Sequence, residues 1–266
     1  MLCFVMALKS PAASADWGRV QMVFEQTLTS VCNQDDADFR VIVICNHKPQ
    51  LRKPAHQSVH FLVRDLPVPN VKASVETMTD KWTKLAHGLV FAAELRPDFV
   101  MLMDADDLVS RRLADHANSK KDSNGWILKE GYHWRYGARL IEYTDNFNCG
   151  TNSIVNSRLI KFPKDVSEDS IQQCVILKNG HTTIEQAMQR QGTPLEALPF
   201  PGAVYVYGHG DNDSTLQGCD RHRKGPGLSL WLGSIRRSLT LERLRARRYL
   251  SLSRKREFGL SGRQPA

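Results

Sequence analysis

Three carboxylates fall within four residues at Asp104-Ala105-Asp106-Asp107, directly after the apolar run at residues 99–103. Like charges this close repel one another, and they share a dry pocket only if a cation joins them. Two carboxylates flanking a small residue suit Mg²⁺ or Mn²⁺, which keep coordination positions open for phosphate oxygens. The cluster therefore predicts a metal site that holds a diphosphate. The alternative is an Asp-rich turn that caps a helix.

The elements around the cluster decide where it lies. The run at 99–103 is short and apolar and predicts a buried strand, so the carboxylates follow its carboxyl end, where ligands bind in open α/β sheets. Further strands are predicted at residues 3–8, 39–45, 59–63 and 203–207, and helices at 16–33, 79–94 and 181–192. This order predicts an α/β fold with a mostly parallel sheet and helices on both faces.

Length and composition set the class. The chain has 266 residues, of which 41% are apolar and 24% charged, enough for one α/β domain with a core. No stretch approaches the roughly 20 apolar residues of a spanning helix, and residues 1–8 indicate a first strand, not a signal peptide. Six scattered cysteines without a Cys-x-x-Cys pair favour buried thiols in a reduced, cytoplasmic setting.

Charge divides the chain into a domain at 1–220 and a basic tail at 221–266. The tail holds 13 Lys/Arg and 2 Asp/Glu (+11), which leaves 23 basic and 26 acidic residues (−3) in the rest. Trp231, Ile235 and Leu239 recur at i+4 among arginines. This pattern predicts either an interfacial helix on anionic lipid, at the inner face of the membrane, or a solvated extension. The mildly acidic domain gives no reason to expect nucleic acid.

The order of these motifs resembles the GT-A glycosyltransferases, the Rossmann-like nucleotide-diphospho-sugar transferases, over about residues 3–213. The similarity is to the inverting class known as family two. Four features carry it: the strand–helix–strand opening, Lys81-x-x-Lys84-x-x-x-Gly88-Leu89, Val100-Met101-Leu102-Met103-Asp104-Ala105-Asp106-Asp107, and Cys149-Gly150-Thr151-Asn152-Ser153-Ile154 followed by a helix and a late histidine. The resemblance implies metal-dependent, inverting transfer of a sugar from a nucleotide-diphosphate donor to a saccharide or lipid-linked acceptor, as in polysaccharide biosynthesis.

The resemblance also implies a role for each residue of the acidic motif. Asp106 would bind Mn²⁺ or Mg²⁺ most directly, with Asp104 on the metal or the ribose and Ala105 beside the nucleotide. His209, in the position of a late family histidine, would complete the metal shell, and Asp107 would support the loop. A cation there would offset the negative charge that develops on the diphosphate leaving group.

Other nucleotide contacts are expected after the early strands. The family recognises the base with polar residues that here correspond to Ser10 and Asn46, and Asp65 is a further candidate for base or ribose. Lys81 and Lys84 are three residues apart and share a helix face. Lys84 is expected to balance phosphate charge; a solvated helix face is the alternative for both lysines.

Inverting transfer requires a base that removes the acceptor hydroxyl proton. The family places an aspartate at the start of a helix where this chain has His181. A histidine, with an ordinary pKa near 6.5, is suited to that task, and Glu185 lies one turn further along to orient or replace it. Glu168-Asp169 lies further upstream and is interpreted as the start of a helix capped by Ser167.

Two other functions fit parts of the pattern. A non-catalytic module would bind a nucleotide-sugar, or scaffold an assembly, without turnover. A haloacid-dehalogenase-like phosphatase also has Asp-x-Asp after a strand. In that family, however, the motif lies near the start of the chain, with Thr or Val two residues past the second Asp, where this chain has Leu108.

Overall fold

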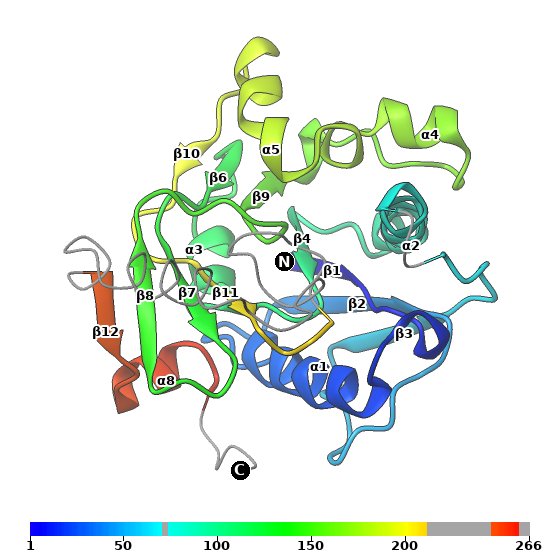
Figure 1. Cartoon of the computed structure of the whole chain (residues 1–266). Coiled ribbons are helices and arrows are strands. Elements are labelled where there is room, and N and C mark those ends of the chain that lie inside the picture. Colours follow the sequence, from blue (N-terminus) through cyan, green and yellow to red (C-terminus); the bar gives the residue numbers. More distant parts are fainter. Residues whose placement is uncertain (71–73, 212–245, 261–266) are drawn as a thin grey trace, which may run out of the picture.

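The structure, a computed structural model, describes residues 1–70, 74–211 and 246–260. Its described residues form two β-sheets with helices packed around them (Figure 1). The central sheet has seven strands in the order β10-β6-β9-β4-β1-β2-β3. Their bounds are β1 Leu2–Ala7, β2 Phe39–Cys45, β3 Val59–Val63, β4 Phe99–Asp104, β6 Gly125–Ile127, β9 Ser153–Asn156 and β10 Glu196–Ala197.

The central sheet is mostly parallel, as predicted. β1 pairs in parallel with both β2 and β4, and β2 with β3, whereas β9 runs antiparallel to its neighbours β4 and β6. Strands of this kind are apolar on both faces because both faces are covered. Successive side chains of β1 point to opposite faces, with Phe4 and Met6 in one core cluster and Cys3 and Val5 in the other.

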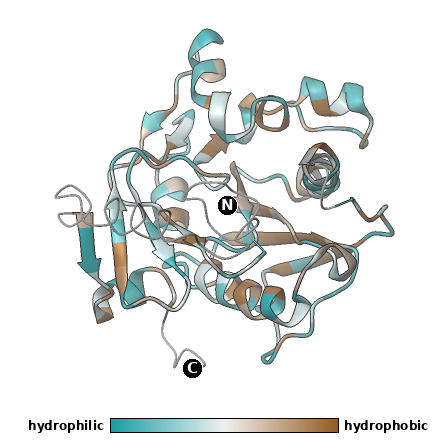
Figure 2. Ribbon diagram, viewed as in Figure 1, coloured by the Kyte–Doolittle hydropathy of each residue, from teal (hydrophilic) through white to brown (hydrophobic). Residues whose placement is uncertain are grey.

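Helices cover both faces of this sheet, and Figure 2 shows its central strands in hydrophobic colours. α1 (Trp17–Val31) and α3 (Leu113–Asn118) pack on one face, and α2 (Ser74–Leu95) and α5 (Val175–Arg190) on the other. Asp16 caps α1, accepting a hydrogen bond from Arg19 N at 2.9 Å. Of the short elements, η2 (Ser157–Leu159) and α4 (Glu168–Gln173) pack on the face covered by α2 and α5, and η1 (Pro11–Ala13) precedes α1. Ser167 caps α4, as predicted.

The second sheet has five strands in the order β12-β8-β7-β11-β5. Their bounds are β5 Leu108–Val109, β7 Gly131–Arg135, β8 Leu140–Thr144, β11 Ala203–Tyr207 and β12 Arg247–Tyr249. β7 and β11 are parallel and the other pairs are antiparallel. Trp134 lies in the core of this sheet, where its indole donates to Ala138 O.

The end of the chain differs from the predicted tail. Residues 246–260 form β12 and the helix α8 (Leu252–Glu257), and Leu250, Phe258 and Leu260 are buried in the core of the second sheet. These three apolar residues thus pack with the second sheet, whereas Arg248 and Arg256 stay exposed. The amphipathic run of Trp231, Ile235 and Leu239 lies outside the described residues.

Two further observations concern the described residues. Their five cysteines, Cys3, Cys32, Cys45, Cys149 and Cys174, are all free thiols. Within the same ranges, every helix is too short or too polar to cross a bilayer.

Candidate functional site

A cavity of about 360 Å³ lies at the carboxyl ends of β1 and β4. It collects side chains from segments far apart in the sequence, because parallel strands bring their carboxyl ends to one edge of the sheet. Six of the predicted site residues line it: Lys84, Asp104, Ala105, Asp106, His181 and His209. The carboxyl edge of the central sheet is therefore where the predicted chemistry comes together.

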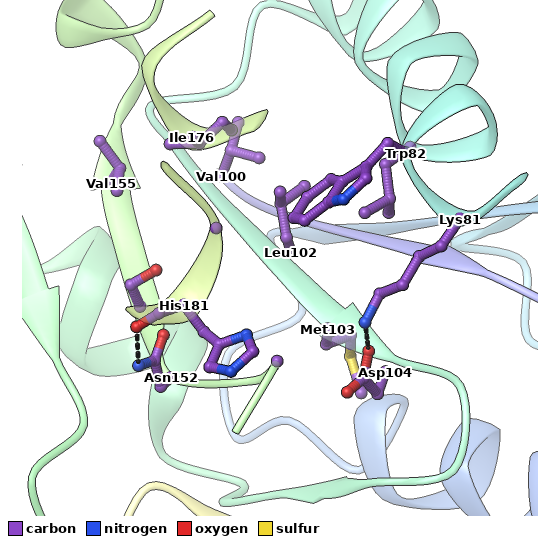
Figure 3. Close-up of a pocket in the computed structure, with 14 residues that line it drawn as sticks. Lys81, Trp82, Val100, Leu102, Met103, Asp104, Asn152, Val155, Ile176 and His181 are labelled. Atoms are coloured by element: carbon purple, nitrogen blue, oxygen red, sulfur yellow. Dashed lines mark hydrogen bonds and ion pairs between the residues drawn. The ribbon is translucent and has the colours of Figure 1, made fainter. Parts of the chain in front are cut away.

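Asp104, the last residue of β4, forms an ion pair with Lys81 of α2 (Figure 3). Burial opposes the charge on the Lys81 ammonium, but the neighbouring Asp104 carboxylate outweighs it and raises the lysine pKa. Gly150 makes room for this carboxylate, since a Cβ there would lie 2.3 Å from Asp104 Oδ2. The sequence left open whether Lys81 has a functional role. In the structure Lys81 is the lysine that pairs directly with the acidic motif.

Lys84 is buried one turn along the same helix. Its ammonium donates to Leu8 O at 3.1 Å and to Asp80 Oδ2 at 2.8 Å. These bonds place a positive charge at the end of β1, on the wall of the cavity. The alternative of a solvated helix face does not hold for Lys84.

Asp106 and His209 meet across the cavity, with 2.9 Å between Asp106 Oδ2 and His209 Nε2. Carboxylate and imidazole are suitable ligands for Mn²⁺, and for Mg²⁺ that also takes phosphate and water oxygens. The donor types of Asp106 and His209 thus fit the implied cation, whereas Asp104 is paired with Lys81. Across the described ranges, no three His, Cys, Asp or Glu side chains gather as a ready set of metal ligands.

Asp107 supports the loop from within, and caps no helix. Its carboxyl is fully buried and accepts from Thr151 Oγ1 at 2.6 Å and from Val206 N at 3.2 Å. Thr151 Oγ1 in turn accepts the N–H of Asp104 at 2.9 Å. Burial, reinforced by the charges of Asp106 and then Asp104, raises the pKa of Asp107 well above its ordinary value. This network fixes the acidic loop between β9 of the central sheet and β11 of the second.

The segment after β11 is held against the start of α1 by Asp211. Its carboxylate accepts from Lys9 Nζ at 3.0 Å, from Ala15 N at 3.0 Å and from Asp16 N at 3.3 Å. Burial works against the charged form of Asp211, but these backbone and lysine donors lower its pKa below the ordinary value. These hydrogen bonds of Asp211 hold the segment that carries His209 against the cavity.

His181 lies on the opposite side of the pocket from Lys81 (Figure 3). It begins the second part of α5, which Gly180 interrupts with φ 54° and ψ −162°. Asn152 of the strand-entry segment before β9 donates its side-chain amide to His181 O at 2.9 Å. Burial lowers the pKa of the imidazole; the nearby Asp104 charge opposes this shift and Lys81 adds to it. Burial of His181 therefore favours the neutral form of its imidazole.

Four predicted residues lie outside the cavity. Glu185 pairs with Lys129 at 2.5 Å, with both side chains about half exposed, because one helical turn carries it about 5 Å from His181 and away from the sheet edge. The buried Ser10 hydroxyl caps η1 through Ala13 N. The Asn46 amide donates to Leu66 O, and Asp65 is exposed.

Apolar contacts that the sequence did not single out form another wall. Val20 and Val23 of α1 and Tyr205 of β11 line the cavity on this side. The charged residues Lys9 and Asp211 also line it and were not predicted. The helical periodicity of α1 marks both valines as core residues, and no local signal distinguishes a core face from a cavity wall. The cavity therefore combines an apolar side with a side rich in charge.

No protein-family model matches the chain, and no curated protein matches it. Among solved structures it is similar to S. aureus TarS 1–349, with 11% identity and a TM-score of 0.43 over 77% of this chain and 60% of that one. For the same protein in complex with UDP-GlcNAc the values are 12% and 0.41, over 78% and 59%. The apo-form glycosyltransferase GlyE of Streptococcus pneumoniae TIGR4 gives 14% and 0.37, over 88% and 60%. The chain thus spans about 60% of the length of these structures.

Proposed function

We propose that this protein is a glycosyltransferase that takes its sugar from a nucleotide-diphosphate donor. The observation that carries the proposal is the cavity at the carboxyl ends of β1 and β4, which brings together Asp104 and Asp106 of the acidic motif, three lysines and two histidines. A diphosphate needs positive charge along its oxygens, and Lys81 and Lys84 supply it from one helix. The apolar side of the cavity, with Val20, Val23 and Tyr205, suits a flat nucleobase.

The proposed reaction includes a divalent cation, Mn²⁺ or Mg²⁺, held by Asp106 and His209. When bound, the cation offsets the negative charge on the departing diphosphate. The Asp104 carboxylate is paired with Lys81. A donor phosphate that binds Lys81 in its place would free this carboxylate to contact the cation or the ribose. The role of Asp107 is to keep this loop in place through Thr151 and Val206.

His181 is the proposed base. It removes the proton of the acceptor hydroxyl while that oxygen attacks the anomeric carbon and the bond to the diphosphate breaks, which inverts the configuration. The lowered pKa of His181 supports this role, since the neutral imidazole is the form that accepts a proton. The acceptor class we propose is a saccharide or lipid-linked saccharide, and the proposed setting is cytoplasmic, in keeping with five free thiols.

The proposal is tested by thermal shift with UDP, GDP, CDP and TDP, each with and without Mn²⁺. A nucleotide at about 100-fold its dissociation constant stabilises the fold by about 2.7 kcal/mol. We expect a metal-dependent shift with one nucleotide, its loss in Asp106→Ala, and no loss in Asp122→Ala, which removes an exposed carboxylate away from the cavity.

The outcomes separate the candidate functions. No shift with any nucleotide would exclude the proposed donor site. Binding without release of the sugar to any saccharide acceptor would favour the non-catalytic module. Release of phosphate from a generic ester, without nucleotide preference, would favour the phosphatase.

A further inference from the structure

Three large apolar side chains are exposed at one corner of the second sheet. Leu140 of β8 and Tyr249 of β12 are directly opposite one another in an antiparallel pair, so their side chains share a face. Leu252 follows three residues later as the first residue of α8. Their exposed fractions are 46%, 66% and 74%. Single exposed apolar residues are ordinary, but a group of this kind marks a contact surface.

The same corner is strongly basic. Residues 246–260 contain five Lys/Arg and one Asp/Glu, a balance of +4. The acidic side chains nearby are already engaged: Glu257 accepts from Ser110 Oγ at 2.6 Å and from Arg112 Nε at 2.8 Å, and Glu142 pairs with Arg247 at 3.3 Å. Arg139 and Arg256 add exposed cations on either side of the apolar group. Figure 2 shows β12 in hydrophilic colours beside the hydrophobic start of α8.

We propose that this corner, formed by Leu140, Tyr249, Leu252 and the surrounding arginines, docks the protein on an anionic lipid bilayer. Leucine side chains enter the boundary between headgroups and acyl chains, and a tyrosine ring is favoured at that depth. Arginines at the same level bind phosphate headgroups. A nucleic acid would use the arginines and stack on the tyrosine, but it would gain nothing from two exposed leucines. The pairing of aliphatic side chains with cations therefore selects lipid.

None of the residues that form this surface lines the cavity. The surface lies on described residues of β8, β12 and α8, which the core of the second sheet holds in place through Leu250 and Phe258. The inference thus stands whether or not the proposed transfer reaction is correct. It predicts a rigid docking face on the folded domain.

The test is flotation of the full chain with vesicles of phosphatidylcholine alone and of phosphatidylcholine containing phosphatidylglycerol. We expect binding to the anionic vesicles only. Tyr249→Ser with Leu252→Ser, which leaves the charge unchanged, should weaken binding at least about tenfold. Arg139→Glu with Arg256→Glu should weaken it to a similar extent and make the remaining binding less sensitive to salt.

Two matched controls keep the outcome decisive. Val63→Ser with Val68→Ser removes two exposed apolar side chains at and after β3, and Lys178→Glu with Arg190→Glu reverses two charges on α5. Both pairs lie on elements away from the corner and should bind as wild type does (Figure 1). Wild-type binding by both corner variants would overturn the proposal. So would an effect of the charge variant alone together with equally tight binding to single-stranded nucleic acid, since that would indicate a general polyanion site.

Discussion

The imidazole of His181 is the group whose ionisation most directly controls the proposed chemistry. Its pKa is lowered by burial, so the neutral form persists further into the acid range than for an exposed histidine. The transfer rate should therefore hold at neutral pH and fall only as the pH drops through this lowered pKa, below 6.5, where the protonated ring no longer accepts a proton.

This prediction is checked by titration of the histidine resonances, with His181→Gln to assign the signal. The same variant should lower the transfer rate by about 10²- to 10⁴-fold, whereas His47→Gln, which changes an exposed histidine outside the cavity, should not. A midpoint for His181 at or above 6.5 would contradict the electrostatic argument.

At the scale of single residues, the sequence found the acidic motif because three carboxylates at the end of an apolar strand are unusual. It favoured Lys84 over Lys81 for a functional role, but both lie on one helix face, and only the packing of α2 decides that Lys81 is the one that reaches Asp104. Gly88 belongs to the motif Lys81-x-x-Lys84-x-x-x-Gly88-Leu89, one of the features that carry the family resemblance. Its place in the structure is a close approach of α2 to the sheet, where a Cβ would lie 2.4 Å from Ile44 Cδ1.

Among the elements, α5 is the one whose shape matters most for the site. Gly180 breaks its helical conformation with φ 54°, so a new helical segment starts at His181, as the sequence predicted. Replacing Gly180 by Ala should cost about 1 kcal/mol of stability, because a Cβ disfavours positive φ. It should also displace the segment, because the new Cβ would lie 3.1 Å from the ring of Trp82.

Gly192→Ala is the matched variant, since Gly192 has φ 73° and no atom within 4 Å of the added Cβ. Both variants should lose similar stability in urea titrations, and only Gly180→Ala should shift the His181 imidazole resonance. An equal shift in the two variants would show that the kink does not position the histidine.

Element prediction worked for runs of five or more residues rich in β-branched and aromatic side chains. The strands at 39–45, 59–63 and 203–207 are found with those bounds, although β3 is only partly buried. The second sheet was largely missed. Its strands include β5 with two residues and β12 with three, and Arg247-Arg248-Tyr249 has no apolar pattern of its own. Such strands form because partners elsewhere in the chain hold them, which local sequence does not encode.

At the scale of the whole molecule, residues 246–260 join parts that are remote in sequence. Arg111 N donates to Glu257 O at 3.0 Å, and Asn33 Nδ2 donates to Arg256 O at 3.0 Å. Gly259 lies so close to α1 that a Cβ would be 2.6 Å from Ser30 Cα. The basic segment thus packs against the end of α1 and the residues after β5, and its charge did not predict this position.

The variant Phe258→Ala measures how much residues 246–260 contribute to the free energy of unfolding. Phe258 is 1% exposed and packs edge-on against Tyr132 with ring centroids 5.6 Å apart, so the truncation leaves a cavity in the core of the second sheet. We expect a loss of about 3–5 kcal/mol in the free energy of unfolding. Leu252→Ala, six residues earlier and 74% exposed, should change it by less than about 0.5 kcal/mol. Urea denaturation of the two variants compares them directly. Similar small losses would mean that residues 246–260 do not share the core. A large loss confined to Phe258→Ala would place residues 246–260 within the cooperative fold that holds the cavity.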